Sequence, residues 1–455
     1  MIAIARARRF ATRPFLVFAS LALIGADAAS HALPKLGVNY VYHGMGKFVR
    51  AHGGAPEEYI AHQNEKLRRI GPVWVRSAGK GDRTALHWAS VEPTEGAFDF
   101  TLHDARVKDS QGRGLLMLGN VDFSGPPSYA RVRGKYFDDA KCLVFLRKIV
   151  ERYDGDGKDD MPGLTQPIKF WEIGNEPGVH SEFRGTAEDY AHVLRISRES
   201  IKANDPDAKI LIGGWVIGQL REEETWRRAL GLFDRTLAAG GGAWFDIMNY
   251  HEYTDDCDFQ TYCHVDAFRA SLEKHGCEKP FWITEANTKL QKEGKGRYAG
   301  VSTRHTVERQ AQDLVKRAIV AFDAGVDVFF WHRIDDIKGE SLGVGLFDAD
   351  DQPKPVFYNL QLLASKLEGF RSIQRIKQMP DSIYLYRLET NAGAELVLWT
   401  EAQDTALDLS GYSPADEVEM AYAITEGGKS QPMVRTAPRS SVPATQTPVF
   451  IRPIR

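Results

Sequence analysis

The sequence has few cysteines, and none of them lies in a motif typical of a zinc site. Its 455 residues include four cysteines, Cys142, Cys257, Cys263 and Cys277, and no CxxC pair. Cys257 and Cys263 are close enough in sequence to form a disulfide in an exported protein, but three connectivities are possible and spacing alone does not choose among them. We therefore interpret the cysteines as structural.

The sequence also lacks the features of two large classes of ligand-binding protein. No glycine-rich phosphate loop follows an early strand, which argues against a doubly wound dinucleotide-binding fold. The formal net charge is −3, and no stripe of Lys and Arg is present. Because phosphate binding depends on clustered basic residues, we expect no nucleic-acid partner.

Long apolar runs are scarce, and the clearest one lies near the N-terminus. Four arginines precede the run 15–24, and Ala26-Asp27-Ala28 follows it. A membrane span needs about 20 apolar residues, so this run is too short, although a permanent N-terminal anchor is the alternative. The pattern predicts a signal peptide over residues 1–28 and a periplasmic or secreted protein with no stable membrane span after processing. Its removal takes the formal charge from −3 to −6.

Short apolar runs alternate with segments of helical periodicity from residue 36 onward. The expected strands are 36–40, 72–78, 114–120, 168–174, 209–215, 245–251, 280–284 and 327–332. Runs that are apolar at nearly every position suit strands that are buried on both faces of a parallel sheet. Eight such units predict a (β/α)8 barrel, a TIM barrel, over residues 34–367.

The remaining segment, residues 369–455, has a different pattern. Its apolar residues alternate with polar ones in five short stretches, and turn residues separate them: 382–389, 394–400, 405–409, 417–424 and 448–454. This pattern predicts a small C-terminal antiparallel β-sandwich domain.

Two carboxylates stand at the ends of predicted strands. Glu176 follows strand four in KFWEIGNEPG, and Glu285 ends strand seven in FWITEAN. Residues at the C-terminal ends of barrel strands converge on one mouth. Two carboxylates about 5 Å apart cannot both ionise freely, so one serves as an acid while the other stays ionised, as retaining glycoside hydrolysis requires.

These strand ends resemble those of clan A glycoside hydrolases. NEP ends strand four and WITE ends strand seven, and the segments WASVEPTEGAFDF (88–100) and GLFDADDQPKPVFYNL (345–360) are also similar to clan members. Within the clan the chain looks most like family 39, although Gly174 stands where family members often carry Trp. The resemblance implies that Glu176 is the acid/base and Glu285 the nucleophile. It implies an oligosaccharide or polysaccharide substrate and no cofactor required for catalysis.

The resemblance also implies a set of substrate-binding residues. Asn175 would bind the hydroxyl next to the anomeric carbon, and Trp331 would form an apolar floor beneath the sugar. Arg76 would hold Glu285 ionised, and His251 or Tyr253 would orient it. Structural alternatives remain for three of them: Arg76 in an ion pair, and His251 and Trp331 in the core.

Other residues near the strand ends have less specific roles. Trp215, with Tyr40 and Tyr250, is a candidate for stacking on sugar rings. Glu172 and Glu252 are poorer candidates for catalysis because each lies within a strand. Alternation directs Glu252 to the face opposite His251.

An acidic segment precedes strand four. YDGDGKDDMPG places Asp154, Asp156 and Asp160 in a D-x-D-G-x-x-D arrangement. Oxygen ligands on a flexible loop favour Ca²⁺, although the Glu that completes an EF-hand loop is missing. Two interpretations stay open: a structural calcium site and a solvated acidic turn.

Two other functions are compatible with a barrel. A carbohydrate-binding protein without catalytic activity would keep the aromatic residues but would not need both carboxylates. A metal-dependent hydrolase would need several His and Asp at strand ends, and the sequence around strand one has no HxH pair.

Overall fold

The computed structural model describes most of the chain after residue 32. The described residues are 33–40, 54–77, 85–123, 127–132, 137–177, 183, 185–217, 223–254, 259, 263–291, 306–336, 342–413, 415–426 and 429–454. The predicted signal peptide and Cys257 lie outside them. Residues 34–455 form one compact unit.

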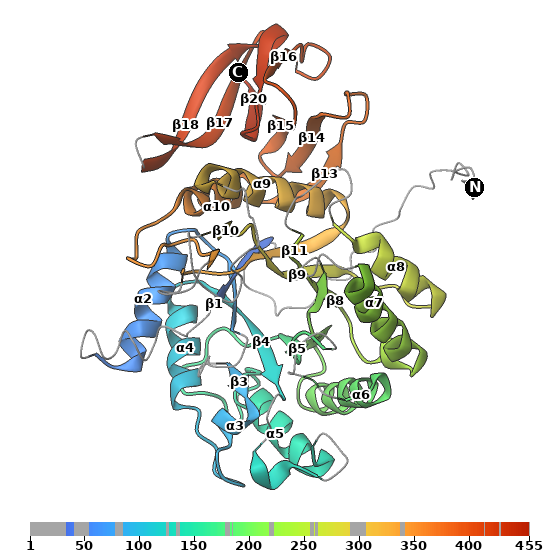
Figure 1. Ribbon diagram of the computed structural model, residues 1–455. Helices are drawn as coiled ribbons and strands as arrows, with labels where there is room; N and C mark the ends of the chain where they lie inside the picture. The colour runs from blue at the N-terminus through green and yellow to red at the C-terminus, as the bar shows by residue number, and fades with distance from the viewer. Residues whose placement is uncertain are drawn as a thin grey trace, which may run out of the picture. The chain divides into compact units, whose positions relative to one another are not determined.

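Eight parallel strands of the described chain form the barrel (Figure 1). They are β1 (Leu36–Tyr40), β2 (Trp74–Ser77), β4 (Leu116–Asp122), β5 (Phe170–Ile173), β6 (Lys209–Ile212), β8 (Met248–Glu252), β9 (Phe281–Ala286) and β11 (Val326–Trp331). The order is β6-β5-β4-β2-β1-β11-β9-β8, and a parallel bridge from Leu211 to Ile247 joins β6 to the start of β8. All eight predicted strands are confirmed, and so is the barrel.

Short strands add to the sheet beside the C-terminal ends of two barrel strands. β7 (Trp215–Ile217) follows β6 and pairs with β8, while β3 (Leu86–His87) pairs with β4. β10 (Leu290–Gln291) and β12 (Leu342–Gly343) form a separate antiparallel pair.

Helices surround the barrel (Figure 1). They are α2 (Pro56–Arg68), α3 (Trp88–Val91), α4 (Thr101–Gly112), α5 (Asp139–Glu151), α6 (Ala187–Asn204), α7 (Glu223–Ala238), α8 (Val265–Lys274), α9 (Val307–Asp323) and α10 (Pro355–Lys366), with short 3₁₀ turns at Ser128–Ala130, Gly241–Ala243 and Arg439–Ser441. Local sequence fixes where several begin. Thr186 and Asp189 form a capping box at α6, and Asp138 caps α5.

Aromatic side chains fill one end of the barrel interior. Trp74, Phe170 and Trp282 come from β2, β5 and β9, and their ring centroids lie 5.0 to 5.2 Å apart. All three stand at or near the N-terminal ends of their strands. This packed layer closes the lower end of the barrel, so polar groups that need access to a substrate have to lie toward the C-terminal ends.

The C-terminal residues form antiparallel sheets, as predicted. Six strands lie in the order β13-β14-β15-β20-β17-β18, and β16 pairs with β19. Their bounds are β13 (Phe370–Arg375), β14 (Ile383–Thr390), β15 (Gly393–Thr400), β16 (Thr405–Leu407), β17 (Glu417–Glu426), β18 (Lys429–Pro438), β19 (Val442–Ala444) and β20 (Val449–Pro453). The predicted domain boundary at residues 367–369 stays a prediction. It coincides with the interval between α10 and β13.

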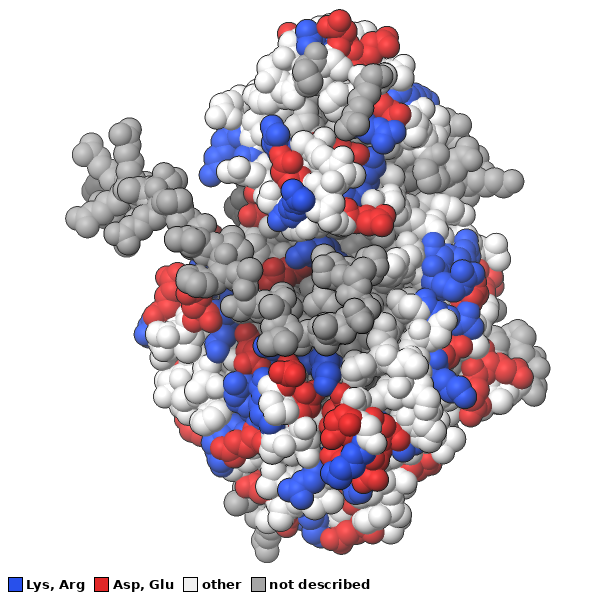
Figure 2. All heavy atoms as spheres, turned by 180° about the vertical axis from the view of Figure 1, so that it is seen from behind, with Lys and Arg blue, Asp and Glu red and all other residues white. Residues whose placement is uncertain are grey.

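The charged residues of the described surface are mixed in sign. Figure 2 shows Lys and Arg interspersed with Asp and Glu over the face that it draws. Within the described residues, no helix has both the length and the apolar character needed to cross a bilayer.

Gly119 of β4 is expected to be essential for the packing of β5. A Cβ atom at Gly119 would lie 2.7 Å from Cε3 of Trp171 and 3.1 Å from Cγ2 of Ile168. Because the indole is a rigid, fully buried ring, Gly119→Ala should lower the free energy of unfolding by about 1–3 kcal/mol in urea denaturation. Gly112→Ala is the control, since no atom lies within 4 Å of the position that its Cβ would take, and equal losses in both variants would contradict this account.

Candidate active site

The segment after β5 presents Asn175 and Glu176 at the mouth of the barrel. Gly174 has a φ of 78° and Glu176 a φ of 45°, so the chain turns sharply where the strand ends. Glycine tolerates this left-handed conformation, but for a glutamate it is strained. Asn175 and Glu176 are largely buried, at 8% and 7% exposure. Strain at a non-glycine residue in a concave position is a mark of functional sites.

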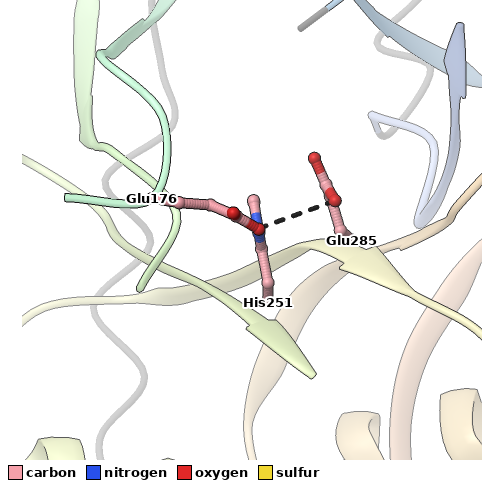
Figure 3. Close-up of side chains that lie close together, drawn as sticks. All are labelled: Glu176, His251 and Glu285. Atoms are coloured by element: carbon pink, nitrogen blue, oxygen red, sulfur yellow. Dashed lines mark hydrogen bonds and ion pairs between the residues drawn. The ribbon is translucent and has the colours of Figure 1, made fainter. Parts of the chain in front are cut away.

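Glu176, His251 and Glu285 lie together, as predicted for the two carboxylates. Figure 3 shows the side chains converging from the end of β5, from β8 and from β9. His251 Nδ1 is 2.9 Å from Glu176 Oε1 and 3.6 Å from Glu285 Oε2. One oxygen of each carboxylate and one ring nitrogen all lie within 4.8 Å of one another. The two acids therefore face each other across a gap narrower than 5 Å.

Arg76 of β2 holds the second carboxylate in place. Its side chain is fully buried, and its Nη1 donates to Glu285 Oε1 at 2.6 Å. Its Nη2 donates to Asn175 Oδ1 at 2.7 Å. Its Nε and Nη2 also form a bidentate ion pair with the carboxylate of Glu172, at 2.5 and 2.9 Å. One guanidinium thus joins the ends of β2, β5 and β9.

Glu172 is a third buried carboxylate, which sequence reasoning did not assign to the site. Besides Arg76, it accepts hydrogen bonds from Asn120, Asn249 and the backbone of Gly214, at 3.0, 2.7 and 3.2 Å. With five donors its oxygens are fully occupied, so its role is structural. The signal available in the sequence was the polar residue in the middle of the apolar run FWEI.

Glu285 is set up to remain ionised. Burial by itself would raise its pKa, but the charges of His251, His332 and Arg76 act against burial. A hydrogen bond from the Tyr253 hydroxyl to Oε2 acts in the same direction, so the pKa is lowered overall. Burial together with the charge of Glu285 raises the pKa of Tyr253 well above its ordinary value, which keeps the phenol protonated as a donor.

His332 is a site residue that sequence reasoning missed. Its Nδ1 lies 3.4 Å from Glu285 Oε2, and its ring meets that of Tyr253 edge-on with centroids 6.0 Å apart. Burial lowers its pKa to about 4, although the charge of Glu285 raises it. At neutral pH His332 is therefore uncharged, and the permanent charge beside Glu285 is that of Arg76. Side chains alternate between the two faces of a strand, so His332 is expected on the same face as Phe330, two residues earlier. Phe330 packs against Trp282 inside the barrel, which places His332 on the inner face.

The structure places the two predicted tryptophans in the core. Trp331 is fully buried, and its Nε1 donates to the carbonyl of Val344 at 3.0 Å. Trp215 is fully buried with its ring against Tyr190 and Phe233, of α6 and α7. These contacts are those of structural residues, and the ring beside Glu285 at the end of β11 is that of His332.

The remaining candidates from the sequence lie both at the mouth of the barrel and in its core. Tyr253 orients Glu285, whereas His251 makes its shorter contact with Glu176. Tyr40 and Tyr250 are fully buried, and the hydroxyl of Tyr250 lies 3.1 Å from Cys263 Sγ. Glu252 turns away from the mouth and pairs with His264, at 2.8 Å.

The predicted acidic and sulfur-containing residues lie elsewhere. Asp154, Asp156 and Asp160 come together in the loop between α5 and β5, with ligand atoms within 4.8 Å of one another. Cys142, Cys263 and Cys277 are free, and Cys257, the suggested partner of Cys263, lies outside the described residues.

The carboxylate pair and His251 also have the composition of a metal site, with three potential ligand atoms within 4.8 Å. Arg76 already places a permanent positive charge 2.6 Å from Glu285. A second cation there would be repelled by the guanidinium, so the electrostatics favour proton transfer and nucleophilic chemistry over metal binding.

No protein-family model matches the sequence. Among solved structures, the chain is similar to a family 39 glycoside hydrolase from the gut symbiont Bacteroides cellulosilyticus WH2, with a TM-score of 0.65, 16% identity, and coverage of 92% of this chain and 81% of that one. The chain is also similar to a GH39 β-xylosidase from Caulobacter crescentus, with a TM-score of 0.59, 14% identity, and coverage of 92% of this chain and 97% of that one. A third similar structure is the catalytic domain of GH30 xylanase C from Talaromyces cellulolyticus, with a TM-score of 0.58, 13% identity, and coverage of 92% of this chain and 96% of that one. The predicted resemblance to clan A is thus confirmed for the fold.

Replacement of Arg76 should destabilise the protein strongly. Arg76→Met would leave the buried carboxylates Glu172 and Glu285 without their cation, at an expected cost of about 3–5 kcal/mol in the free energy of unfolding at neutral pH. Chemical denaturation measures this cost. The control is Arg68→Met, which removes an exposed pair with Glu65 and should leave stability nearly unchanged. Similar effects of the two variants would contradict the assigned role of Arg76.

Proposed function

We propose that the chain is a retaining glycoside hydrolase that acts on an oligosaccharide or polysaccharide. The observation that carries this proposal is that one carboxylate oxygen of Glu176 and one of Glu285 lie within 4.8 Å of each other at the ends of β5 and β9. Retaining enzymes hold their two carboxyl groups about 5–5.5 Å apart, whereas inverting enzymes keep about 6.5–9.5 Å for a water molecule. The clan A fold of the chain supports the same assignment.

The reaction follows from the different surroundings of the two acids. Glu285, ionised through Arg76 and Tyr253, attacks the anomeric carbon while Glu176 gives its proton to the departing glycosidic oxygen. The C–O bond to the leaving group breaks as the bond to Glu285 forms. Glu176, now a carboxylate, removes a proton from water, which attacks the same carbon and releases Glu285. Two inversions restore the original configuration.

Neighbouring residues assist this sequence. Asn175 is fixed by its hydrogen bond to Arg76, so its amide nitrogen can donate to the hydroxyl next to the anomeric carbon. His251 contacts both acids, at 2.9 and 3.6 Å, and lies where a proton on its Nδ1 favours the ionised form of Glu176. Through its contact at 2.9 Å, His251 is suited to orient Glu176.

The rival function, carbohydrate binding without catalysis, explains the site less well. A binding site gains nothing from a strained backbone at Glu176 or from the charge of Arg76 and the hydrogen bond of Tyr253 that hold Glu285 ionised. Several of the similar structures are those of a β-xylosidase or a xylanase, which makes xylose-containing glycans a first substrate class to test.

Two further properties belong to this proposal. The arginines and short apolar run of residues 1–28 support export to the periplasm or the medium after cleavage. The acid pair supplies both the proton and the nucleophile, so the reaction requires no organic cofactor.

Removal of each acid should give a different signature. Glu176→Ala should lower kcat/KM by about 10²–10⁴-fold on natural glycans, with a smaller loss on activated aryl glycosides that need less protonation. Glu285→Ala should abolish turnover of both. The measurement is a screen of aryl β-glycosides and bacterial exopolysaccharides with azide, which should give a retained azide product with Glu176→Ala and an inverted one with Glu285→Ala.

The matched control is Glu65→Ala. It removes a carboxylate of helix α2 that pairs with Arg68 and Arg113, and it should keep full activity. A fluorinated glycoside should also label wild-type protein on the peptide that contains Glu285. Turnover by Glu285→Ala without azide, or the same anomer from both variants, would refute the assignment.

The pH profile should respond to Tyr253. The pKa of Glu285 is lowered in the folded protein, and the hydrogen bond from Tyr253 contributes to this, so Tyr253→Phe should raise it. The acidic limb of kcat/KM, which reports the group that must be ionised in the free enzyme, should therefore move up by about one pH unit. Tyr250→Phe, three residues earlier on β8, is the control and should leave the limb in place. An unchanged limb in Tyr253→Phe would show that the tyrosine does not hold Glu285 ionised.

A further inference from the structure

The loop between α5 and β5 folds back on itself and gathers three carboxylates. Gly155 and Gly157 have φ values of 76° and 90°, and the backbone N–H groups of both donate to the carboxylate of Asp160, at 3.0 and 2.8 Å. Ligand atoms of Asp154, Asp156 and Asp160 lie within 4.8 Å of one another. The turn thus holds three negative side chains around one point.

The cations nearest to these carboxylates are engaged with other groups. Lys158 Nζ pairs with Glu151 at 2.8 Å, and Lys169 Nζ pairs with Asp205 at 2.9 Å. Arg152 pairs with Asp104, on α4. Within the described part of the chain, no ion pair reaches the three aspartates. Arg152 and Lys158 attract Asp160 and Asp156, but their ion pairs are with Asp104 and Glu151, so the mutual repulsion of the three aspartates is only partly balanced.

Asp154 provides a second and independent indication of a ligand. Its side chain is 2% exposed, and its Oδ1 accepts a hydrogen bond from the backbone of Asp156 at 3.2 Å. Its Oδ2 is buried and has no hydrogen-bond partner among the described residues. A buried carboxylate oxygen without a donor is costly, so a positive ligand at this position is favoured.

We propose that this loop binds one Ca²⁺ ion through Asp154, Asp156 and Asp160. Ca²⁺ accepts carboxylate oxygens at about 2.3–2.6 Å, so two oxygens on opposite sides of one ion lie up to about 5 Å apart. The three ligand atoms lie within 4.8 Å of one another, which is compatible with this ion. Mg²⁺ demands about 2.0–2.1 Å and near-octahedral geometry and gives up its water ligands reluctantly, so a loop with three carboxylates favours Ca²⁺.

The ion would stabilise the segment that leads to the acid/base residue, without taking part in the chemistry. The backbone N–H of Ile168 donates to the carbonyl of Tyr153 at 2.8 Å, and Lys169 Nζ donates to the carbonyl of Asp154 at 2.6 Å. The two ends of the loop are thus joined directly before β5 begins. Three side-chain carboxylates are a small ligand set, so the dissociation constant should be on the order of 10⁻⁴ M or weaker.

The test uses the full chain, stripped with EDTA and desalted. Titration calorimetry should show one Ca²⁺ per chain. The melting temperature should rise with CaCl2 above the dissociation constant, and it should rise more than with MgCl2 or with NaCl of equal ionic strength. Asp156→Ala removes a ligand from an exposed position and should lose both the heat of binding and the shift in melting temperature.

The matched control is Asp159→Asn. Asp159 is an exposed residue of the same loop with a φ of 52°, a conformation that asparagine adopts readily, and it lies outside the ligand cluster. This variant should bind Ca²⁺ as the wild type does. An absent calcium effect in the wild type, an equal effect of Mg²⁺, or an equal loss in the two variants would overturn the proposal in favour of a solvated acidic turn. None of these outcomes depends on hydrolytic activity.

Discussion

The site depends on one buried guanidinium. Arg76 sits at the end of β2 with no exposed surface and makes hydrogen bonds to Glu172, Asn175 and Glu285, which belong to β5, the turn after it, and β9. A buried charge of this kind is tolerated only when its partners satisfy it fully, and each partner in turn is tolerated only because of the arginine. The positions of three strand ends are therefore coupled through a single side chain.

Three carboxylates in the same barrel have different hydrogen-bond partners. Glu172 accepts five hydrogen bonds and has no capacity left for a substrate. Glu285 is held by Arg76 and Tyr253 but keeps a partly exposed face, at 6%. Glu176 has His251 as its close partner. All three are glutamates, so the hydrogen bonds and charges around each one, and not the residue type, distinguish them.

The fold and the acid pair were accessible from sequence because their signals are local. Runs such as FWEI and VDVFFW are apolar through almost their whole length, which is required of strands covered on both faces. Two of the strands that sequence patterns missed, β13 and β18, are the two edges of the C-terminal six-stranded sheet. Edge strands face solvent on one side and tolerate residues such as Pro432, so they carry little apolar periodicity.

By itself the sequence determined that eight buried strands alternate with helices and that Glu176 and Glu285 end two of them. Chain periodicity and the shared direction of parallel strands are sufficient for that conclusion. Only the tertiary structure decided that Glu172 is satisfied, that His251 contacts Glu176 as well as Glu285, and that His332 rather than Trp331 stands beside Glu285. Those distinctions rest on hydrogen bonds between residues from tens to hundreds of positions apart, and such partners are set by strand register and side-chain packing across the barrel.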